Sequence, residues 1–166
     1  MKNTTLCYIQ REGQYLMLHR VKKENDLNHD KWIGVGGKFE AGETPEECLL
    51  REVREETGLR LTDYTFRGIV HFRSDKWEDE EMYLYTAEGF EGEVAAGCPE
   101  SNVNGGTPVG EGIGCPEGEL HWIPIPEVMK LNLWEGDRIF LQQLVDGKTD
   151  IDLTLRYKGN DLVEWD

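Results

Sequence analysis

The 166-residue chain is short of basic side chains. It has 18 Lys and Arg against 33 Asp and Glu, which gives a formal net charge of −15 at pH 7. Proteins that bind duplex nucleic acid neutralise its phosphates with clustered Lys and Arg. The charge balance therefore argues against a duplex nucleic acid partner, and an anionic substrate would need a cation between itself and the protein.

Long apolar segments are also missing. No run approaches the roughly 20 residues that a membrane-spanning helix needs. The opening residues MKNTTLCYIQREG lack the basic start, apolar middle and small-residue cleavage site of a secretory signal. We therefore expect no membrane partner and a cytoplasmic location.

Cysteines are few, and their spacing carries no metal or redox motif. The four are Cys7, Cys48, Cys98 and Cys115, with no CxxC pair and no His at zinc-ligand spacing. We interpret them as free thiols. The tetrapeptide GCPE occurs twice, around Cys98 and around Cys115, so an approach of these two cysteines remains an alternative.

One domain is expected over residues 1–166, because a chain of this length can bury one sizeable core. Within it, residues 97–116 are rich in Gly, Pro and Asn and have no apolar periodicity, which predicts a loop insertion. Residues 32–43 contain too many glycines for regular structure and are expected to form a second loop.

The remaining pattern predicts a mixed α+β fold. Aromatic and β-branched residues favour strands at 4–10, 15–20, 64–72, 81–87 and 121–125, and a hairpin over 153–165 closes around the turn KGND. The stretch IFLQQLV predicts a helix over 134–145.

Residues 44–58 carry the start and stop signals of another helix. Thr44 followed by Pro45 and Glu47 is typical of a capping box, and Gly58 is typical of a left-handed cap. The apolar residues at helical spacing predict a buried stripe, which comprises Leu49, Leu50 and Val53.

A neighbouring face of this helix is acidic. Glu52, Glu55 and Glu56 lie three or four positions apart, a spacing at which like charges repel. Carboxylates at that spacing converge beside the helix, and such hard oxygen donors suit Mg²⁺ or Mn²⁺ rather than zinc. For an arbitrary Glu/Arg-rich string the alternative is a solvated face with ion pairs.

The spacing of the residues around these glutamates favours the interpretation as a metal site. The chain matches every position of G-x5-E-x7-R-E-U-x-E-E-x-G-U, where U is bulky and apolar, from Gly37 to Leu59. This pattern resembles the Nudix box. The resemblance implies an α/β/α sandwich with a mixed sheet and a loop-helix-loop box, spanning nearly the whole chain apart from the insertion. It also implies hydrolysis, with divalent cations, of a nucleoside diphosphate linked to another group.

The resemblance assigns roles by position. It implies that Glu52, Glu55 and Glu56 bind the metal, with the carbonyl of Gly36 as a further donor. Glu52 is our candidate for the base that activates water. Two further members of the predicted catalytic set, Arg51 and Glu43, would orient the helix and the loop.

Many members of the family take a further ligand from a later loop. Glu119 is our candidate, Glu117 is nearly as good, and an ordinary exposed Glu is the alternative.

Two stretches point to a substrate class. DKWIGVGGKFEAGE and LNLWEGDRIF resemble the MutT-type and animal oxidised-purine triphosphatases, which convert 8-oxo-dGTP to the monophosphate and pyrophosphate. The resemblance implies that Trp134 stacks on a purine and Asp137 meets its polar edge; alternatively Trp134 is a core residue and Asp137 a helix-start charge. Ile33 stands where the animal enzymes have an Asn that contacts the base.

Other candidates would bind the substrate from the Gly-rich loop and the strand before it. Val35, Gly37 and Lys38 belong to that loop, and Arg20 ends the second predicted strand. Arg20 and Lys38 could hold phosphates. Lys22 and Lys23 could do so too, or could lie on a solvated surface.

Two competing functions remain open at this point. The box does not distinguish triphosphates from ADP-ribose or dinucleoside polyphosphates. A non-catalytic nucleotide sensor with this fold is the third hypothesis, although the intact set of Glu52, Glu55 and Glu56 argues against it. The sequence is compatible with a monomer or a homodimer.

Overall fold

A computed structural model describes residues 1–20, 30–94 and 118–166. The predicted insertion at 97–116, with Cys98 and Cys115, lies outside the described residues, as do Lys22, Lys23 and Glu117. The other two cysteines, Cys7 and Cys48, are free and buried.

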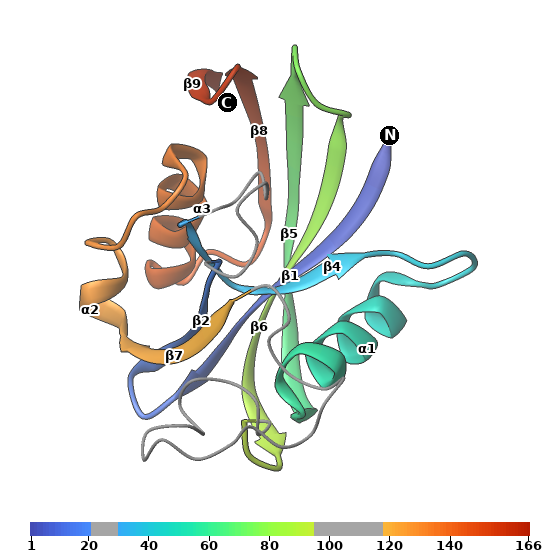
Figure 1. Ribbon diagram of the computed structural model, residues 1–166, viewed down its shortest axis with the longest axis vertical. Coiled ribbons are helices and arrows are strands. Elements are labelled where there is room, and N and C mark those ends of the chain that lie inside the picture. The colour runs from blue at the N-terminus through green and yellow to red at the C-terminus, as the bar shows by residue number, and fades with distance from the viewer. Residues whose placement is uncertain (21–29, 95–117) are drawn as a thin grey trace.

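The described residues form a nine-stranded sheet with three helices (Figure 1). The elements in chain order are β1 (Lys2–Arg11), β2 (Gln14–His19), β3 (Trp32–Ile33), β4 (Val35–Lys38), α1 (Pro45–Thr57), β5 (Arg60–Ser74), β6 (Glu80–Glu91), β7 (Glu119–Pro124), α2 (Ile125–Val128), α3 (Glu135–Val145), β8 (Ile151–Lys158) and β9 (Asp161–Trp165). The strand order is β3-β2-β1-β6-β5-β8-β9, while β4 pairs with β1 and β7 with β2.

Strand β1 joins the two parts of this sheet. It runs parallel to β6, from Lys2 opposite Glu80 to Ile9 opposite Ala87. Its other edge pairs antiparallel with β4 and then, at Arg11, with β2. The Gly-rich segment is therefore held directly against the middle of the molecule.

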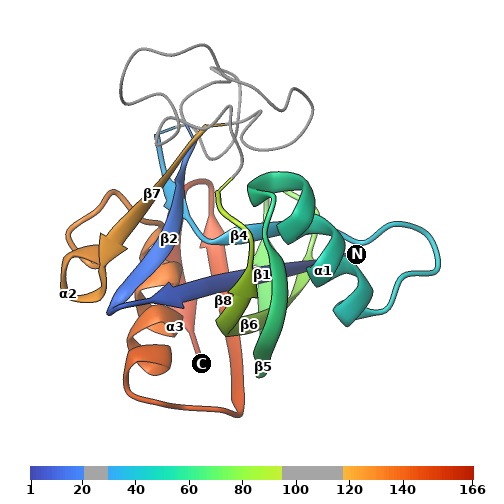
Figure 2. The same cartoon turned by 90° about the horizontal axis from the view of Figure 1, so that it is seen from below.

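Helices cover both faces of the sheet, and each encloses its own core (Figure 2). On one face, α1 packs Leu49 and Val53 against a cluster that includes Ile9. On the other, α3 packs Phe140 and Leu144 into a second cluster with residues of β5, β6 and β8. The predicted α+β sandwich with a mixed sheet is confirmed.

Residues 32–43 were expected to lack regular structure, and that expectation holds for 39–43 but is wrong for 32–38. Residues 32–38 form the short strands β3 and β4, and Thr5 of β1 lies opposite Gly37. A side chain at Gly36 would place its Cβ 2.0 Å from the Thr5 carbonyl oxygen. The glycine therefore permits the strand pairing instead of preventing it.

Two other details differ from the sequence pattern. Leu50 was expected on the buried stripe of α1 but is 36% exposed, and the buried positions are Cys48, Leu49, Val53 and Thr57. The short helix α2 was not predicted. In the described parts of the chain, no helix is long and apolar enough to cross a membrane.

Candidate functional site

Local signals fix where α1 begins and ends. Thr44 Oγ1 accepts from the Glu47 backbone N at 3.1 Å, and Glu47 Oε1 accepts from the Thr44 backbone N at 2.9 Å. Gly58 ends the helix in the left-handed conformation, with φ of 79°. The predicted capping box and left-handed cap are confirmed, and they set which way the glutamates of the helix face.

Arg51 ties this helix to the loop before it. Its Nε donates to Glu43 Oε2 at 2.6 Å, and its Nη2 donates to Glu43 Oε1 at 2.9 Å and to the Lys38 carbonyl at 3.0 Å. Its Nη1 donates to Glu52 Oε1 at 2.8 Å and to Glu55 Oε2 at 3.1 Å. One guanidinium thus orients two of the predicted metal ligands.

The same contacts shift the acidity of Glu43. Hydrogen bonds from Arg51, and then from the Glu40 backbone, lower the pKa of the Glu43 carboxyl to about 2. Arg51 is correspondingly held in its charged form, because the bonds to Glu43 raise its pKa. The pair is therefore ionised across the whole neutral range.

Glu52 has the opposite shift. Burial raises the pKa of its carboxyl, the bond from Arg51 opposes that effect, and the charge of Glu55 adds to it. Only 16% of the side chain is exposed. The carboxylate lies against β4, where a Cβ on Gly37 would come within 2.5 Å of Glu52 Oε2. Gly37 therefore leaves the room that the carboxylate occupies.

Glu56 faces the same backbone. Its Oε1 accepts from the Gly36 N–H at 3.2 Å. Glu52 and Glu56 thus both lie beside the Gly36–Gly37 segment, while Glu55 is 55% exposed and is held by Arg51. The structure brings the predicted ligands of the box to one patch.

This patch suits a hard divalent cation. The donor atoms are all oxygens, which favours Mg²⁺ or Mn²⁺ over zinc, and a cation would offset the cost of burying the Glu52 charge beside two other carboxylates. Across residues 1–20, 30–94 and 118–166, no three His, Cys, Asp or Glu side chains are already arranged around a metal position. The patch thus supplies suitable ligands, while the metal site itself stays a proposal.

Glu119 lies at the start of β7, opposite His19 of β2. Its Oε1 is 3.3 Å from His121 Nε2. The structure thus gives this carboxylate a histidine partner, and its role as a further metal ligand stays a prediction.

A cavity of about 320 Å³ begins beside the acidic patch. Most of the predicted substrate contacts line it, namely Arg20, Gly37, Lys38, Trp134 and Asp137, and so does Gly36, the predicted carbonyl donor to the metal. Val35 differs, because its side chain is fully buried in the core on the α1 side. The side chain of Val35 therefore belongs to the core and does not reach the cavity.

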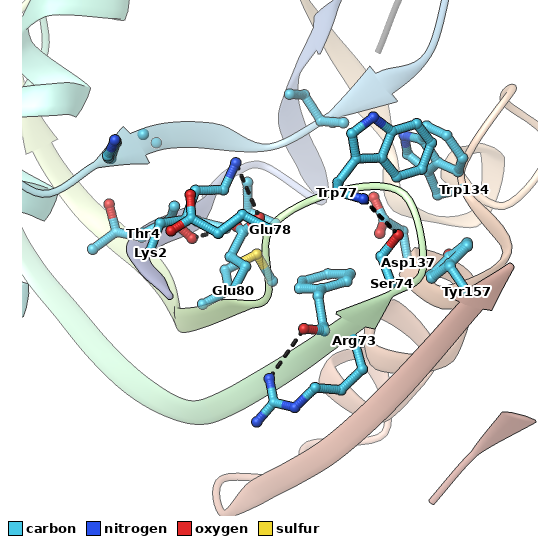
Figure 3. Close-up of a pocket in the computed structure, with 18 of the residues that line it drawn as sticks. Lys2, Thr4, Arg73, Ser74, Trp77, Glu78, Glu80, Trp134, Asp137 and Tyr157 are labelled. Carbon is cyan, nitrogen blue, oxygen red and sulfur yellow. Dashed lines mark hydrogen bonds and ion pairs between the residues drawn. The ribbon is translucent and has the colours of Figure 1, made fainter. Parts of the chain in front are cut away.

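Trp134 and Asp137 lie where α3 begins, and both line the cavity (Figure 3). Burial, and then the charge of Glu80, raise the pKa of the Asp137 carboxyl to about 7, against the opposing effect of Lys31 and Arg138. A half-protonated carboxyl of this kind can both donate and accept a hydrogen bond near neutral pH. Asp137 lies in the first turn of α3, and its contact with the edge of a base stays a prediction.

Sequence reasoning missed several residues of this cavity. Trp77, in the turn between β5 and β6, lines it and meets Trp134 with ring centroids 6.4 Å apart. Tyr157 of β8 and Glu80 of β6 also contribute. A lone Trp in the charged stretch RSDKWEDE was the one available signal, and it was weak, because single apolar side chains are common on protein surfaces.

Comparison with known proteins gives this arrangement a family. The family model described as NUDIX domain matches residues 2–144. An oxidized purine nucleoside triphosphate hydrolase of Danio rerio is 24% identical over 163 residues, which cover 98% of this chain and 90% of that protein. The uncharacterized Nudix hydrolase YvcI of Bacillus subtilis (strain 168) is 24% identical over 161 residues, covering 95% and 87%.

Solved structures show the same fold. The crystal structure of a mutator MutT protein from Bacillus halodurans superposes with a TM-score of 0.80 at 24% identity, covering 100% of this chain and 97% of that one. A MutT NUDIX hydrolase from Burkholderia pseudomallei superposes with a TM-score of 0.66 at 23% identity, covering 86% and 97%.

Proposed function

The chain belongs to the NUDIX domain family, and from that premise we propose that it hydrolyses a purine nucleoside triphosphate, 8-oxo-dGTP or a related nucleotide, to the monophosphate and pyrophosphate. One observation carries the proposal. A single cavity extends from Gly36, Gly37 and Lys38, beside the acidic patch, to Trp134 and Asp137. A nucleotide could therefore place its phosphates at one end and its base at the other.

The phosphate end has the charges that the reaction needs. Lys38 lines the cavity there and would bind phosphate oxygens, and Arg20, whose backbone N–H donates to the Lys31 carbonyl, also lines the cavity and is a second candidate. Glu52, Glu55, Glu56 and the Gly36 carbonyl would hold Mg²⁺ or Mn²⁺, with Glu119 as the candidate for a further ligand. The metal would neutralise phosphate oxygens and make its bound water more acidic.

Glu52 would accept the proton of the attacking water. Its side chain is only 16% exposed, and Arg51 holds it beside the Gly36–Gly37 segment, where a metal-bound water would lie. Arg51 and Glu43 would not touch the substrate. They would hold the direction of the Glu52 carboxylate, as partners of ligand side chains commonly do.

The base end combines stacking with one polar contact. Trp134 would stack on the purine, and Asp137 would donate or accept a hydrogen bond at its edge. Ile33 also lines the cavity and has no polar group to contribute. Recognition of the base edge would therefore depend more heavily on Asp137 than on the Gly-rich loop. The similarity to the oxidized purine nucleoside triphosphate hydrolase of Danio rerio supports this substrate class. A cytoplasmic location and a monomeric or homodimeric state remain predictions.

The test is a substrate panel with two variants. Purified protein with Mg²⁺ would be given 8-oxo-dGTP, dGTP, ATP, ADP-ribose and a diadenosine polyphosphate, and all products would be separated by chromatography. We expect pyrophosphate and a monophosphate from the purine triphosphates. Glu52→Gln should lower kcat by roughly 10²–10⁴-fold, and Glu127→Gln, a change in the remote helix α2, should not.

The alternative functions predict different results in the same assay. Fastest turnover of ADP-ribose or the dinucleoside would keep the metal chemistry and reject the triphosphate assignment. Tight binding of a nucleotide without turnover at any Mg²⁺ or Mn²⁺ concentration would identify a sensor. Normal turnover by Glu52→Gln would remove this carboxylate from the mechanism.

A further inference from the structure

Trp77 is one of the cavity residues to which neither the box nor the family resemblance points. It lies in the turn between β5 and β6, and Figure 3 shows its indole beside that of Trp134 at the rim of the cavity. The two residues come from distant parts of the chain and meet only in the folded protein. Their meeting point is the end of the cavity that we assign to the base.

The turn that carries Trp77 is anchored on both sides. Ser74 Oγ accepts from the Trp77 backbone N at 3.0 Å. Asp75 Oδ1 accepts from the Gly159 backbone N of the β8–β9 turn at 2.9 Å. The indole is therefore presented by a fixed backbone, which limits the ordering cost when a ligand stacks on it.

The two indoles form a corner. Their ring centroids are 6.4 Å apart and their planes are inclined by 77°. This edge-to-face geometry gives two flat aromatic surfaces at nearly a right angle, so a planar base lying on one indole can meet the other with its edge.

A lysine lies over each ring. Lys76 Nζ is 5.0 Å from the Trp77 centroid, and Lys31 Nζ is 4.9 Å from the Trp134 centroid. These ammonium groups put positive charge beside the corner in a chain whose net charge is −15. Each indole therefore already makes one cation–π contact, which helps to hold it in place.

We propose that Trp77 is a specificity-determining residue that contacts the base together with Trp134 and favours purine over pyrimidine nucleotides. The inference rests on the proposed function, because it concerns the base end of the same cavity. A purine has two fused rings and so gains more than a pyrimidine from a second aromatic surface. Removing that surface should reduce the difference between them.

The test replaces the ring while keeping apolar volume. Kinetic constants would be measured for dGTP and dCTP with the wild type, Trp77→Leu and Trp77→Phe. For Trp77→Leu we expect the KM for dGTP to rise roughly tenfold, as loss of one base–aromatic contact predicts, with a smaller rise for dCTP. The kcat for dGTP should change little, and Trp77→Phe should restore most of the preference. Trp165→Leu is the control, because Trp165 lies on β9 and is 53% exposed.

Binding of dGMP and dCMP, measured by calorimetry on the same proteins, separates this inference from the proposed function. Triphosphate turnover with an unchanged dGTP/dCTP preference in Trp77→Leu would overturn the role of Trp77 and leave the proposed function standing. The opposite result is that the wild type binds dGMP preferentially without any turnover, and that Trp77→Leu abolishes this preference. This result would overturn the proposed function and leave the role of Trp77 standing. If the wild type neither binds nor hydrolyses these nucleotides, both proposals are wrong. Should Trp77→Leu fail to fold, Trp77→Met gives the same comparison.

Discussion

Arg51 and Glu43 form a forked pair, in which Nε and Nη2 of the guanidinium donate to the two carboxylate oxygens at 2.6 and 2.9 Å. The third nitrogen of the same guanidinium donates to Glu52 at 2.8 Å. The loop that contains Glu43 and the helix that contains Glu52 are therefore positioned by one planar group. A lysine could supply the charge but not this geometry.

Arg51→Lys should for this reason lower activity while leaving the charge unchanged. We expect kcat/KM to fall roughly 10–100-fold, the usual cost of disturbing the partner of a ligand carboxylate. Steady-state kinetics would measure it. Arg60→Lys is the matched control, because Arg60 Nη2 also bonds both oxygens of a carboxylate, that of Glu91, but on the exposed surface. Equal activities of the two variants would contradict a positioning role.

Gly36 and Gly37 should respond differently to alanine. At Gly36 the new Cβ would meet the Thr5 carbonyl oxygen at 2.0 Å, and this backbone cannot move without breaking the pairing of β4 with β1. At Gly37 it would meet only the Glu52 carboxylate, which can rotate away. Gly36→Ala should lower the melting temperature, whereas Gly37→Ala should keep the fold and lose activity. Thermal melts and assays on both proteins would check this, and equal melting temperatures would contradict it.

Asp137 should make stability depend on pH. Its pKa is raised from 3.8 to about 7 in the folded protein, so the native state binds the proton more tightly than the unfolded chain. Stability from this group is complete below about pH 4, falls as the pH rises to about 7, and stays low above it. Asp137→Asn should remove this dependence.

The measurement is urea unfolding from pH 4 to 8 for both proteins. The wild type should lose up to about 4 kcal/mol relative to Asp137→Asn across that range, an order-of-magnitude value for a shift of this size. Parallel pH curves would show that the pKa of this carboxyl is not raised in the folded protein.

Mg²⁺ should stabilise the protein as well as support turnover. The metal would bind the folded acidic patch and relieve repulsion among its glutamates, so at ten times its dissociation constant it would add about 1.4 kcal/mol. EDTA should abolish activity, and added Mg²⁺ should restore it. The rise in melting temperature with Mg²⁺ should be present in the wild type and in Glu127→Gln, and much smaller in Glu56→Gln. A similar rise in all three would place the metal elsewhere.

Helix α1 was predictable because its signals are local. Thr44, Pro45 and Glu47 specify the start, Gly58 specifies the end, and none depends on the rest of the fold. The same holds for the acidic patch, whose spacing is set by the helix itself. The burial of Leu50 was predicted wrongly, because the strands beneath a helix decide how much of its surface is buried. Here they leave Leu50 36% exposed.

The elements that escaped prediction depend on distant partners. Val35–Lys38 is a strand only because β1 lies beside it, and its glycines permit that approach. Trp77 could not be assigned to the cavity, since Trp134 is far away in sequence and only the sheet brings the two together. Val35 shows the opposite error. Its position in the Gly-rich loop suggested a contact with the substrate, but its side chain is buried in the core.

The pairing of β1 with β6 also has a consequence for biosynthesis. Lys2 pairs with Glu80 and Ile9 with Ala87, so β1 emerges from the ribosome long before its parallel partner exists. At about 5–20 residues per second, the wait lasts several seconds. During that time the apolar side chains of β1, which are buried in the finished protein, remain available to chaperones or to other nascent chains. Slower translation of the following residues should prolong that exposure.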